Sequence, residues 1–172
     1  MKEIQIGGLV SFTTIDYPGK LAGVLFLMGC PLRCAYCSNP HLLQVGDGPY
    51  DPAKVLEWIE SRKGKLEAIV FSGGEALMQG DATIDYMKRV RNLGFNIGLH
   101  TNGFYPDLLK RPNQLLIGLD WITRPHVQNM NHWLEILLHT NKCLNHWISG
   151  LAQVKISRFA LHVIHVLLQK MT

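Results

Sequence analysis

The sequence feature that most limits the fold of this chain is an apolar run followed at once by a loop with three cysteines. Residues 21–28 form the run, and Cys30, Cys34 and Cys37 follow with C-x3-C-x2-C spacing. A short unbroken apolar run is typical of a strand that is buried on both faces, as in a parallel sheet covered by helices. The sequence therefore predicts a buried strand that leads directly into a metal-binding loop.

Three thiolates in one loop favour an iron–sulfur cluster. Four cysteines normally hold a four-iron cluster, so three would leave one iron without a protein ligand. An open coordination position is where a metal centre can bind substrate. Zinc is an alternative, because His41 would complete a Cys3His set with these cysteines. Three unrelated thiols are a further alternative, and Cys143 is too isolated in the sequence to count as a ligand.

The composition is that of a globular protein in a reducing compartment. The 172 residues are enough for one domain with a core, and a charged fraction of 17% does not indicate disorder. The apolar runs are too short for a spanning helix, and the N-terminal residues lack a signal-peptide pattern. Three cysteines in one loop do not form a secreted disulfide framework. We expect a cytoplasmic protein that binds neither membranes nor nucleic acid.

Strands and helices are predicted to alternate after the cysteine loop. This alternation indicates a parallel sheet or barrel with right-handed crossovers. Before the loop, the sequence predicts a hairpin or edge strand, with Pro18 and Gly19 at the centre of a type II turn. Further strands are expected at residues 67–72, 95–100 and 115–122. Helices are expected from Asp51-Pro52 onward, around residues 84–94 and, more weakly, near 106–109.

Two further motifs follow predicted strands, Gly73-Gly74-Glu75 and Thr101-Asn102-Gly103. Glycines let a backbone approach a ligand closely, and a carboxylate can accept hydrogen bonds from an ammonium group. Taken singly, each motif could be an ordinary turn, with the Glu at a helix N-terminus. In a parallel sheet they would share one edge with the cysteine loop, which in an α/β barrel is the face that carries active sites. The combination therefore favours one functional site.

With these motifs the chain resembles radical S-adenosylmethionine enzymes, and most closely the activating proteins of anaerobic ribonucleoside-triphosphate reductase. The matching segments are TTIDYPGKLAGVLFLMGCPLRCAYCSNPHLL, FSGGEALMQ and GFNIGLHTNGFYP, and the resemblance covers about residues 5–122. It implies an α/β fold, a partial (β/α) barrel of the radical S-adenosylmethionine type with about four βα units.

The resemblance also implies roles for particular residues. No side chain is expected to act as a catalytic acid or base, because the cofactor supplies the chemistry. Related activators often have Asp where this chain has His100, so a ligand contact by that acid is in doubt, and His100 could equally be a hydrogen-bonded residue lining the barrel. The implied ligands of a [4Fe-4S] cluster are Cys30, Cys34 and Cys37. The implied contacts with S-adenosylmethionine are Tyr36 beside the adenine, Gly73, Gly74 and Glu75 at the methionine amino group, and Thr101 and Asn102 nearby.

The activity implied by the resemblance is reductive cleavage of S-adenosylmethionine to methionine and a 5′-deoxyadenosyl radical. That radical would take a hydrogen atom from a glycine of the reductase, and flavodoxin or ferredoxin would supply the electron. The segment Asp16-Tyr17-Pro18-Gly19 is similar to an Asp-x-Pro-Gly segment of many activators, although it could be only a turn. The alternatives are a radical S-adenosylmethionine enzyme that acts on a small molecule and a zinc-stabilised binding module.

The sequence changes character after residue 122. The whole formal net charge of +4 comes from residues 121–172, which hold 5 Lys and Arg but 1 Asp or Glu. The resemblance ends at the same place. We expect two parts, a partial barrel at 1–122 and an atypical tail at 123–172. The tail is either an out-of-frame or truncated replacement for the rest of the barrel or a divergent helical cap.

Overall fold

The computed structural model describes residues 3–35, 37–105 and 107–108. The chain divides into two units, Met1–His126 and Val127–Thr172, and all described residues belong to the first. Outside the described residues lie Tyr36, the predicted strand at 115–122, the tail at 123–172, and Pro106 and Leu109 of the weakly predicted helix near 106–109. Among the described residues, no helix is long and apolar enough to cross a membrane.

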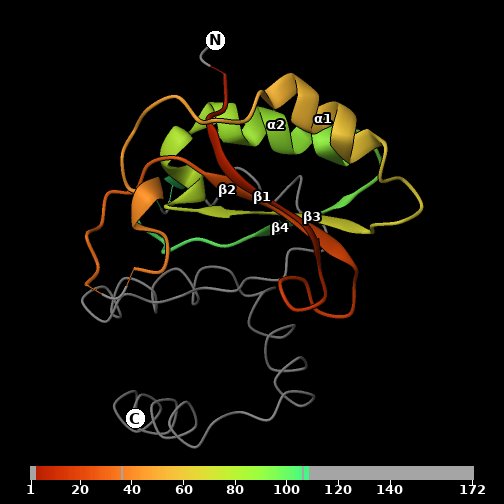
Figure 1. Ribbon diagram of the computed structural model, residues 1–172, viewed down its shortest axis with the longest axis horizontal. Helices are drawn as coiled ribbons and strands as arrows, with labels where there is room; N and C mark the ends of the chain where they lie inside the picture. The colour runs from red at the N-terminus through yellow and green to blue at the C-terminus, as the bar shows by residue number, and fades with distance from the viewer. Residues whose placement is uncertain (1–2, 36, 106, 109–172) are drawn as a thin grey trace, which may run out of the picture. The chain divides into compact units, whose positions relative to one another are not determined.

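The described residues form an α/β fold around a four-stranded sheet, which confirms the predicted fold class (Figure 1). β1 pairs antiparallel with β2, whereas β2, β3 and β4 run parallel to one another. The predicted edge strand and the three parallel strands at 21–28, 67–72 and 95–100 are thus confirmed to within one or two residues at each end. The strands lie in the order β1 (Ile6–Thr13), β2 (Ala22–Leu27), β3 (Ala68–Gly73) and β4 (Asn96–Leu99).

The predicted type II turn precedes β2. The Lys20 N–H donates to the Tyr17 carbonyl oxygen at 3.3 Å, and Gly19 has a φ of 69°. The third residue of a type II turn needs a positive φ, which glycine adopts without steric cost. The Tyr17 side chain beside this turn is buried against small side chains of β2 and β3.

Two helices cover one face of the sheet (Figure 1). α1 (Pro52–Glu60) begins as predicted, with the Asp51 carboxylate accepting from the Ala53 N–H at 2.8 Å. α2 (Asp81–Asn92) ends before Gly94, which has a φ of 99°. An edge-to-face contact between Phe71 and Tyr86 packs α2 against β3. Two 3-10 helices, η1 (Pro40–Leu42) and η2 (Ala76–Gln79), were not predicted, because three or four residues are too few to show a helical period.

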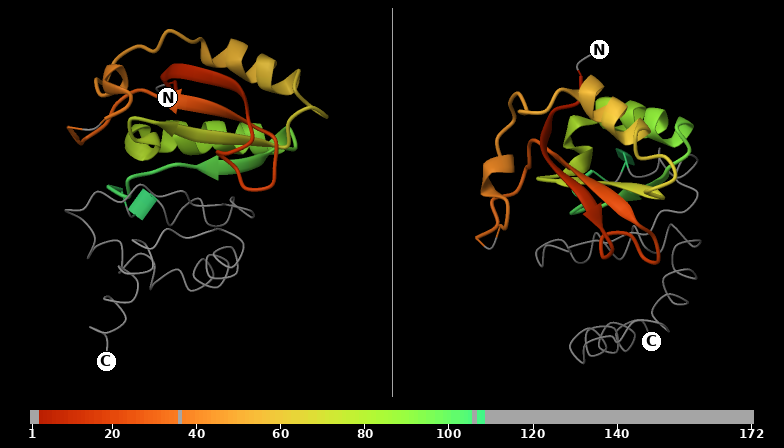
Figure 2. Two further views of the ribbon diagram at one scale, coloured as in Figure 1. Left: turned by 60° about the horizontal axis from the view of Figure 1, so that its bottom comes forward. Right: turned by 45° about the vertical axis from the view of Figure 1, so that its right-hand side comes forward.

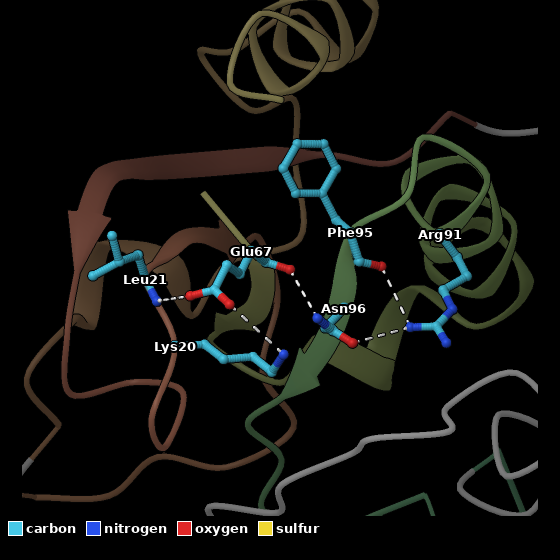
Figure 3. A network of polar contacts seen from close by, with 6 residues as sticks. All are labelled: Lys20, Leu21, Glu67, Arg91, Phe95 and Asn96. Carbon is cyan, nitrogen blue, oxygen red and sulfur yellow. Dashed lines mark hydrogen bonds and ion pairs between the residues drawn. The ribbon is translucent and has the colours of Figure 1, made fainter. Parts of the chain in front are cut away.

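A network of polar contacts holds the starts of the parallel strands together (Figure 3). The Glu67 carboxylate accepts from the Leu21 N–H at 3.3 Å and lies 3.9 Å from the Lys20 ammonium. The Glu67 main-chain oxygen accepts from the Asn96 side-chain amide at 3.0 Å. The Arg91 Nη1 in turn lies 3.5 Å from the Asn96 side-chain oxygen. These contacts join the segments that lead into β2, β3 and β4.

The strands start level, and β2 and β3 also end level, whereas β4 ends two residues earlier. Ala22 of β2 pairs with Ala68 of β3, which pairs with Asn96 of β4. Five residues further along, Leu27 pairs with Gly73. Figure 2 shows the cysteine loop, in orange, beyond the end toward which the parallel strands point. The segments after β2, β3 and β4 therefore meet at one edge of the sheet, as the sequence predicted.

Candidate functional site

The cysteine loop leaves the end of β2 and returns to its own starting point. The Gly29 N–H donates to the Leu42 carbonyl oxygen at 2.7 Å, and the Cys30 N–H donates to the Leu43 oxygen at 3.2 Å. Both acceptors lie at the end of η1. The short helix η1 therefore closes the base of the loop, so that all three cysteines lie on a segment that is held at both ends.

The three cysteines are free thiols in different environments. The Cys30 side chain is buried, whereas Cys34 and Cys37 are partly exposed. Burial raises the pKa of the Cys30 thiol, and the charges of Glu75, Cys34 and Cys37 raise it further, against the opposing effect of the Leu32 N–H. A metal binds the thiolate, so metal binding at Cys30 must release a proton.

Arg33 shapes the loop from inside the cysteine motif, a role that was not predicted from the sequence. Its Nη1 donates to the Cys30 carbonyl oxygen at 2.7 Å and to the Leu32 oxygen at 2.9 Å. The guanidinium group thus holds two main-chain oxygens of the loop together. A cation between the first two cysteines was the only sequence signal for this role.

Gly73 and Gly74 allow the backbones of β3 and β2 to approach closely. Gly73 has a φ of 124°, and a Cβ atom there would lie 2.2 Å from the Leu27 nitrogen. A Cβ atom on Gly74 would lie 2.4 Å from the Gly29 oxygen and 2.9 Å from the Cys30 Cβ. Neither glycine can carry a side chain without movement of the backbone. Their predicted approach to a ligand stays a prediction.

Glu75 is buried, with 1% of its surface exposed, and its carboxylate accepts three hydrogen bonds. Its Oε1 accepts from the Leu77 N–H at 3.0 Å and from the Thr101 hydroxyl at 2.7 Å. Its Oε2 accepts from the Asn102 N–H at 2.7 Å. Burial raises the pKa of Glu75 above its ordinary value, and the three donors partly offset that increase. The carboxylate therefore joins the segment after β3 to the segment after β4.

The segment after β4 is a compact turn that faces the cysteine loop. The Thr101 hydroxyl oxygen accepts from the Gly103 N–H at 3.1 Å, and the Asn102 side-chain oxygen accepts from the Phe104 N–H at 3.0 Å. The Asn102 side-chain nitrogen lies 3.9 Å from the Cys30 sulfur. The structure thus brings Thr101 and Asn102 together with Glu75, and it brings Asn102 to the first cysteine as well.

His100 lies at the end of β4 and contacts the turn that precedes β2. Its Nε2 lies 3.3 Å from the Asp16 main-chain oxygen. A carbonyl oxygen can only accept, so the ring nitrogen is the donor in this bond. The contact joins the Asp16-Tyr17-Pro18-Gly19 segment to the end of β4, and the role of His100 at the site stays a prediction.

A pair of glutamines, also missed by sequence reasoning, supports the end of β2. The Gln79 side-chain nitrogen donates to the Met28 oxygen at 2.9 Å and to the Gln5 main-chain oxygen at 2.8 Å. The Gln5 N–H donates to the Gln79 side-chain oxygen at 2.7 Å. These bonds fix the chain two residues before Cys30, so the base of the cysteine loop is held from a second side.

The donor set of this loop fits an iron–sulfur cluster. It offers three thiols with no disulfide among them, and the Cys30 sulfur receives a hydrogen-bond donor, the Asn102 side-chain nitrogen. In the part of the chain that the structure describes, no three His, Cys, Asp or Glu side chains converge where one metal ion could bind. Each cysteine of a four-iron cluster binds a different iron, so a cluster does not need the convergence that a single zinc ion requires.

Comparison with known proteins identifies the class to which this site belongs. The sequence matches the Radical SAM superfamily over residues 24–163, and the chain belongs to this superfamily. Members of the superfamily are iron–sulfur enzymes that use a [4Fe-4S] cluster and S-adenosylmethionine. The resemblance described from the sequence is thereby confirmed at the level of the superfamily. The matched range continues past residue 122, and the division of the chain at that residue stays a prediction.

Several relatives are named as activating enzymes. The chain is 33% identical over 105 residues to a Methanocaldococcus jannaschii protein described as a glycyl-radical enzyme activating enzyme, covering 61% of this chain and 43% of that one. It is 30% identical over 124 residues to the pyruvate formate-lyase-activating enzyme of Clostridium pasteurianum, covering 67% and 52%. It is also 30% identical over 146 residues to the 7-carboxy-7-deazaguanine synthase of Methanopyrus kandleri, covering 70% and 58%.

Among solved structures, QueE from Escherichia coli matches with a TM-score of 0.48 and 18% identity, over 59% of this chain and 53% of that one. The chain therefore spans about half the length of the relatives it matches.

The backbone packs too closely around Gly74 to leave room for a side chain. We expect Gly74→Ala to lower the free energy of unfolding by about 1–3 kcal/mol, because the new methyl group must displace the Gly29 carbonyl or Cys30. Urea unfolding of the purified protein measures this change. Gly46→Ala is the matched control, since a Cβ atom on Gly46 meets nothing within 4 Å. Equal stability of the two variants would contradict the packing described for Gly74.

Proposed function

We propose that this chain carries the cluster and cofactor site of a radical S-adenosylmethionine activating enzyme, which generates a glycyl radical on anaerobic ribonucleoside-triphosphate reductase. The observation that carries the proposal is a loop of three free cysteines at the edge of the parallel sheet, where Cys30 contacts Asn102 and Asn102 is bound by Glu75. Superfamily membership and relatives named as activating enzymes support it.

In this proposal Cys30, Cys34 and Cys37 hold the cluster. The segment Gly73-Gly74-Glu75 receives the methionine amino group of S-adenosylmethionine. Glu75 has three donors among the described residues, but an ionised carboxylate has about four acceptor positions, so these donors leave one position on Oε2. Tyr36 beside the adenine completes the proposed contacts. When bound, the cluster and S-adenosylmethionine supply the electron transfer and the 5′-deoxyadenosyl radical that removes a hydrogen atom.

The proposed partners are the reductase that receives the glycyl radical and an electron donor such as flavodoxin or ferredoxin. The Asp16-Tyr17-Pro18-Gly19 segment supports an activator, since it is similar to the segment found in many activators and makes an ordered turn joined to β4 through His100. A second candidate function is a radical reaction on a small molecule. The similarity to a 7-carboxy-7-deazaguanine synthase supports that alternative.

The metal ligands are tested by single substitutions. We expect Cys30→Ala, Cys34→Ala and Cys37→Ala each to lose most of the iron and sulfide bound after anaerobic reconstitution, because no other described cysteine can replace a lost thiolate. Iron and sulfide analysis with absorption spectroscopy measures the loss. Cys143→Ala is the control and should bind iron and sulfide as the unaltered chain does. A colourless unaltered protein that binds zinc in place of iron would overturn the proposal.

The partner is tested by electron paramagnetic resonance. We expect a glycyl-radical signal when the protein, S-adenosylmethionine and a reductant are mixed anaerobically with anaerobic ribonucleoside-triphosphate reductase. The Cys34→Ala variant should give no signal under the same conditions, because it lacks a cluster ligand. Cleavage of S-adenosylmethionine to methionine and 5′-deoxyadenosine without any radical on the reductase would instead support the small-molecule function.

A further inference from the structure

The side chain of Asn102 points its amide nitrogen at a cysteine of the cluster loop. Its Nδ2 lies 3.9 Å from the Cys30 sulfur, while its Oδ1 accepts from the Phe104 N–H at 3.0 Å. The Phe104 N–H can only donate, so it must face the amide oxygen. That contact determines which end of the amide is the nitrogen, and the group that faces the sulfur is therefore a hydrogen-bond donor.

The main chain of Asn102 is held in place by the buried carboxylate of Glu75. The Asn102 N–H donates to Glu75 Oε2 at 2.7 Å, and the neighbouring Thr101 hydroxyl donates to Oε1 at 2.7 Å. Glu75 and Thr101 are 1% and 5% exposed, so water does not compete for these bonds. The donor at the Cys30 sulfur is thus fixed at its backbone by Glu75 and at its side-chain oxygen by Phe104.

We propose that Asn102 tunes the reduction potential of the cluster through a hydrogen bond to the Cys30 sulfur, and that Glu75 positions it for this role. The inference rests on the proposed function, because it needs a cluster at the cysteine loop. The reduced cluster carries one more negative charge than the oxidised cluster. A donor at a ligand sulfur stabilises that charge, and hydrogen bonds to the sulfurs are a known determinant of such potentials.

This role differs from a contact with S-adenosylmethionine, which the resemblance assigns to the same residue. It also differs from a purely structural turn, which would need only the Oδ1 contact with Phe104. The Leu32 main chain acts against the rise in the Cys30 pKa, but it belongs to the loop itself, and a side-chain substitution leaves it in place. Asn102 is therefore the donor whose contribution can be removed by mutation.

Two substitutions distinguish the role of Asn102 as a hydrogen-bond donor to Cys30 from its role in the turn. Asn102→Ser keeps an oxygen that can accept from the Phe104 N–H but is too short to reach Cys30. Asn102→Asp keeps the shape and the acceptor, but places a negative oxygen where the donor was. Asn92→Ser is the matched control, because Asn92 is exposed at the end of α2, before β4 begins and away from the carboxyl end of the sheet.

The experiment is a redox titration of the reconstituted cluster in the absence of S-adenosylmethionine and of any partner. Electron paramagnetic resonance measures the amount of reduced cluster at each potential. At a fixed potential we expect Asn102→Ser to lower the ratio of reduced to oxidised cluster about threefold to tenfold, as the loss of one ordinary hydrogen bond implies. Asn102→Asp should lower it further because of its charge. Asn92→Ser should titrate as the unaltered protein does.

The outcomes separate this inference from the proposed function. If the unaltered protein binds no iron and sulfide, the proposed function fails and the inference fails with it. If the cluster forms but both Asn102 variants titrate as the unaltered protein does, the inference is overturned and the proposed function stands. Loss of iron and sulfide from both Asn102 variants, with Asn92→Ser unaffected, would mean that Asn102 builds the loop and would also overturn the tuning role.

Discussion

The arrangement of the site depends on one buried carboxylate. Glu75 is removed from water, and a buried charge without partners is strongly unfavourable. Its three donors come from Leu77 in η2 and from Thr101 and Asn102 after β4. The segments after β3 and β4 must therefore stay together to satisfy it. The main-chain N–H of Glu75 also donates to the Gly29 oxygen at 2.8 Å, and this bond joins Glu75 to the start of the cysteine loop.

The sheet brings these segments within reach of one another. Polar contacts around Glu67 hold the strand starts level, and the parallel pairing carries that alignment to the other end. There the absence of side chains at Gly73 and Gly74 lets the backbone approach Leu27 and Cys30. The position of Cys30 is thus linked to the packing at Gly73 and Gly74 and to the burial of the Glu75 carboxylate. A ligand bound at the cysteines would lie among groups that the fold holds in place.

Much of this architecture was predictable from the sequence, because its signals are local. The apolar runs predicted β2, β3 and β4, and their alternation with helices placed the motifs at one edge of the sheet. The contacts of Glu75 were not predictable, since Thr101 and Asn102 lie 26 and 27 residues away in the sequence and meet it only through strand pairing. The role of Arg33 was missed for a different reason, because its acceptors are main-chain oxygens that leave no pattern in the sequence.

We propose that the three cysteines hold a cluster with an open iron that binds S-adenosylmethionine. The most direct measurement is the electron paramagnetic resonance spectrum of the reduced protein, recorded with and without S-adenosylmethionine. We predict the spectrum of a reduced four-iron cluster that changes when S-adenosylmethionine is added, because the ligand would bind the iron without a protein ligand. A cluster spectrum that S-adenosylmethionine leaves unchanged would contradict the claim, as would the absence of any cluster signal.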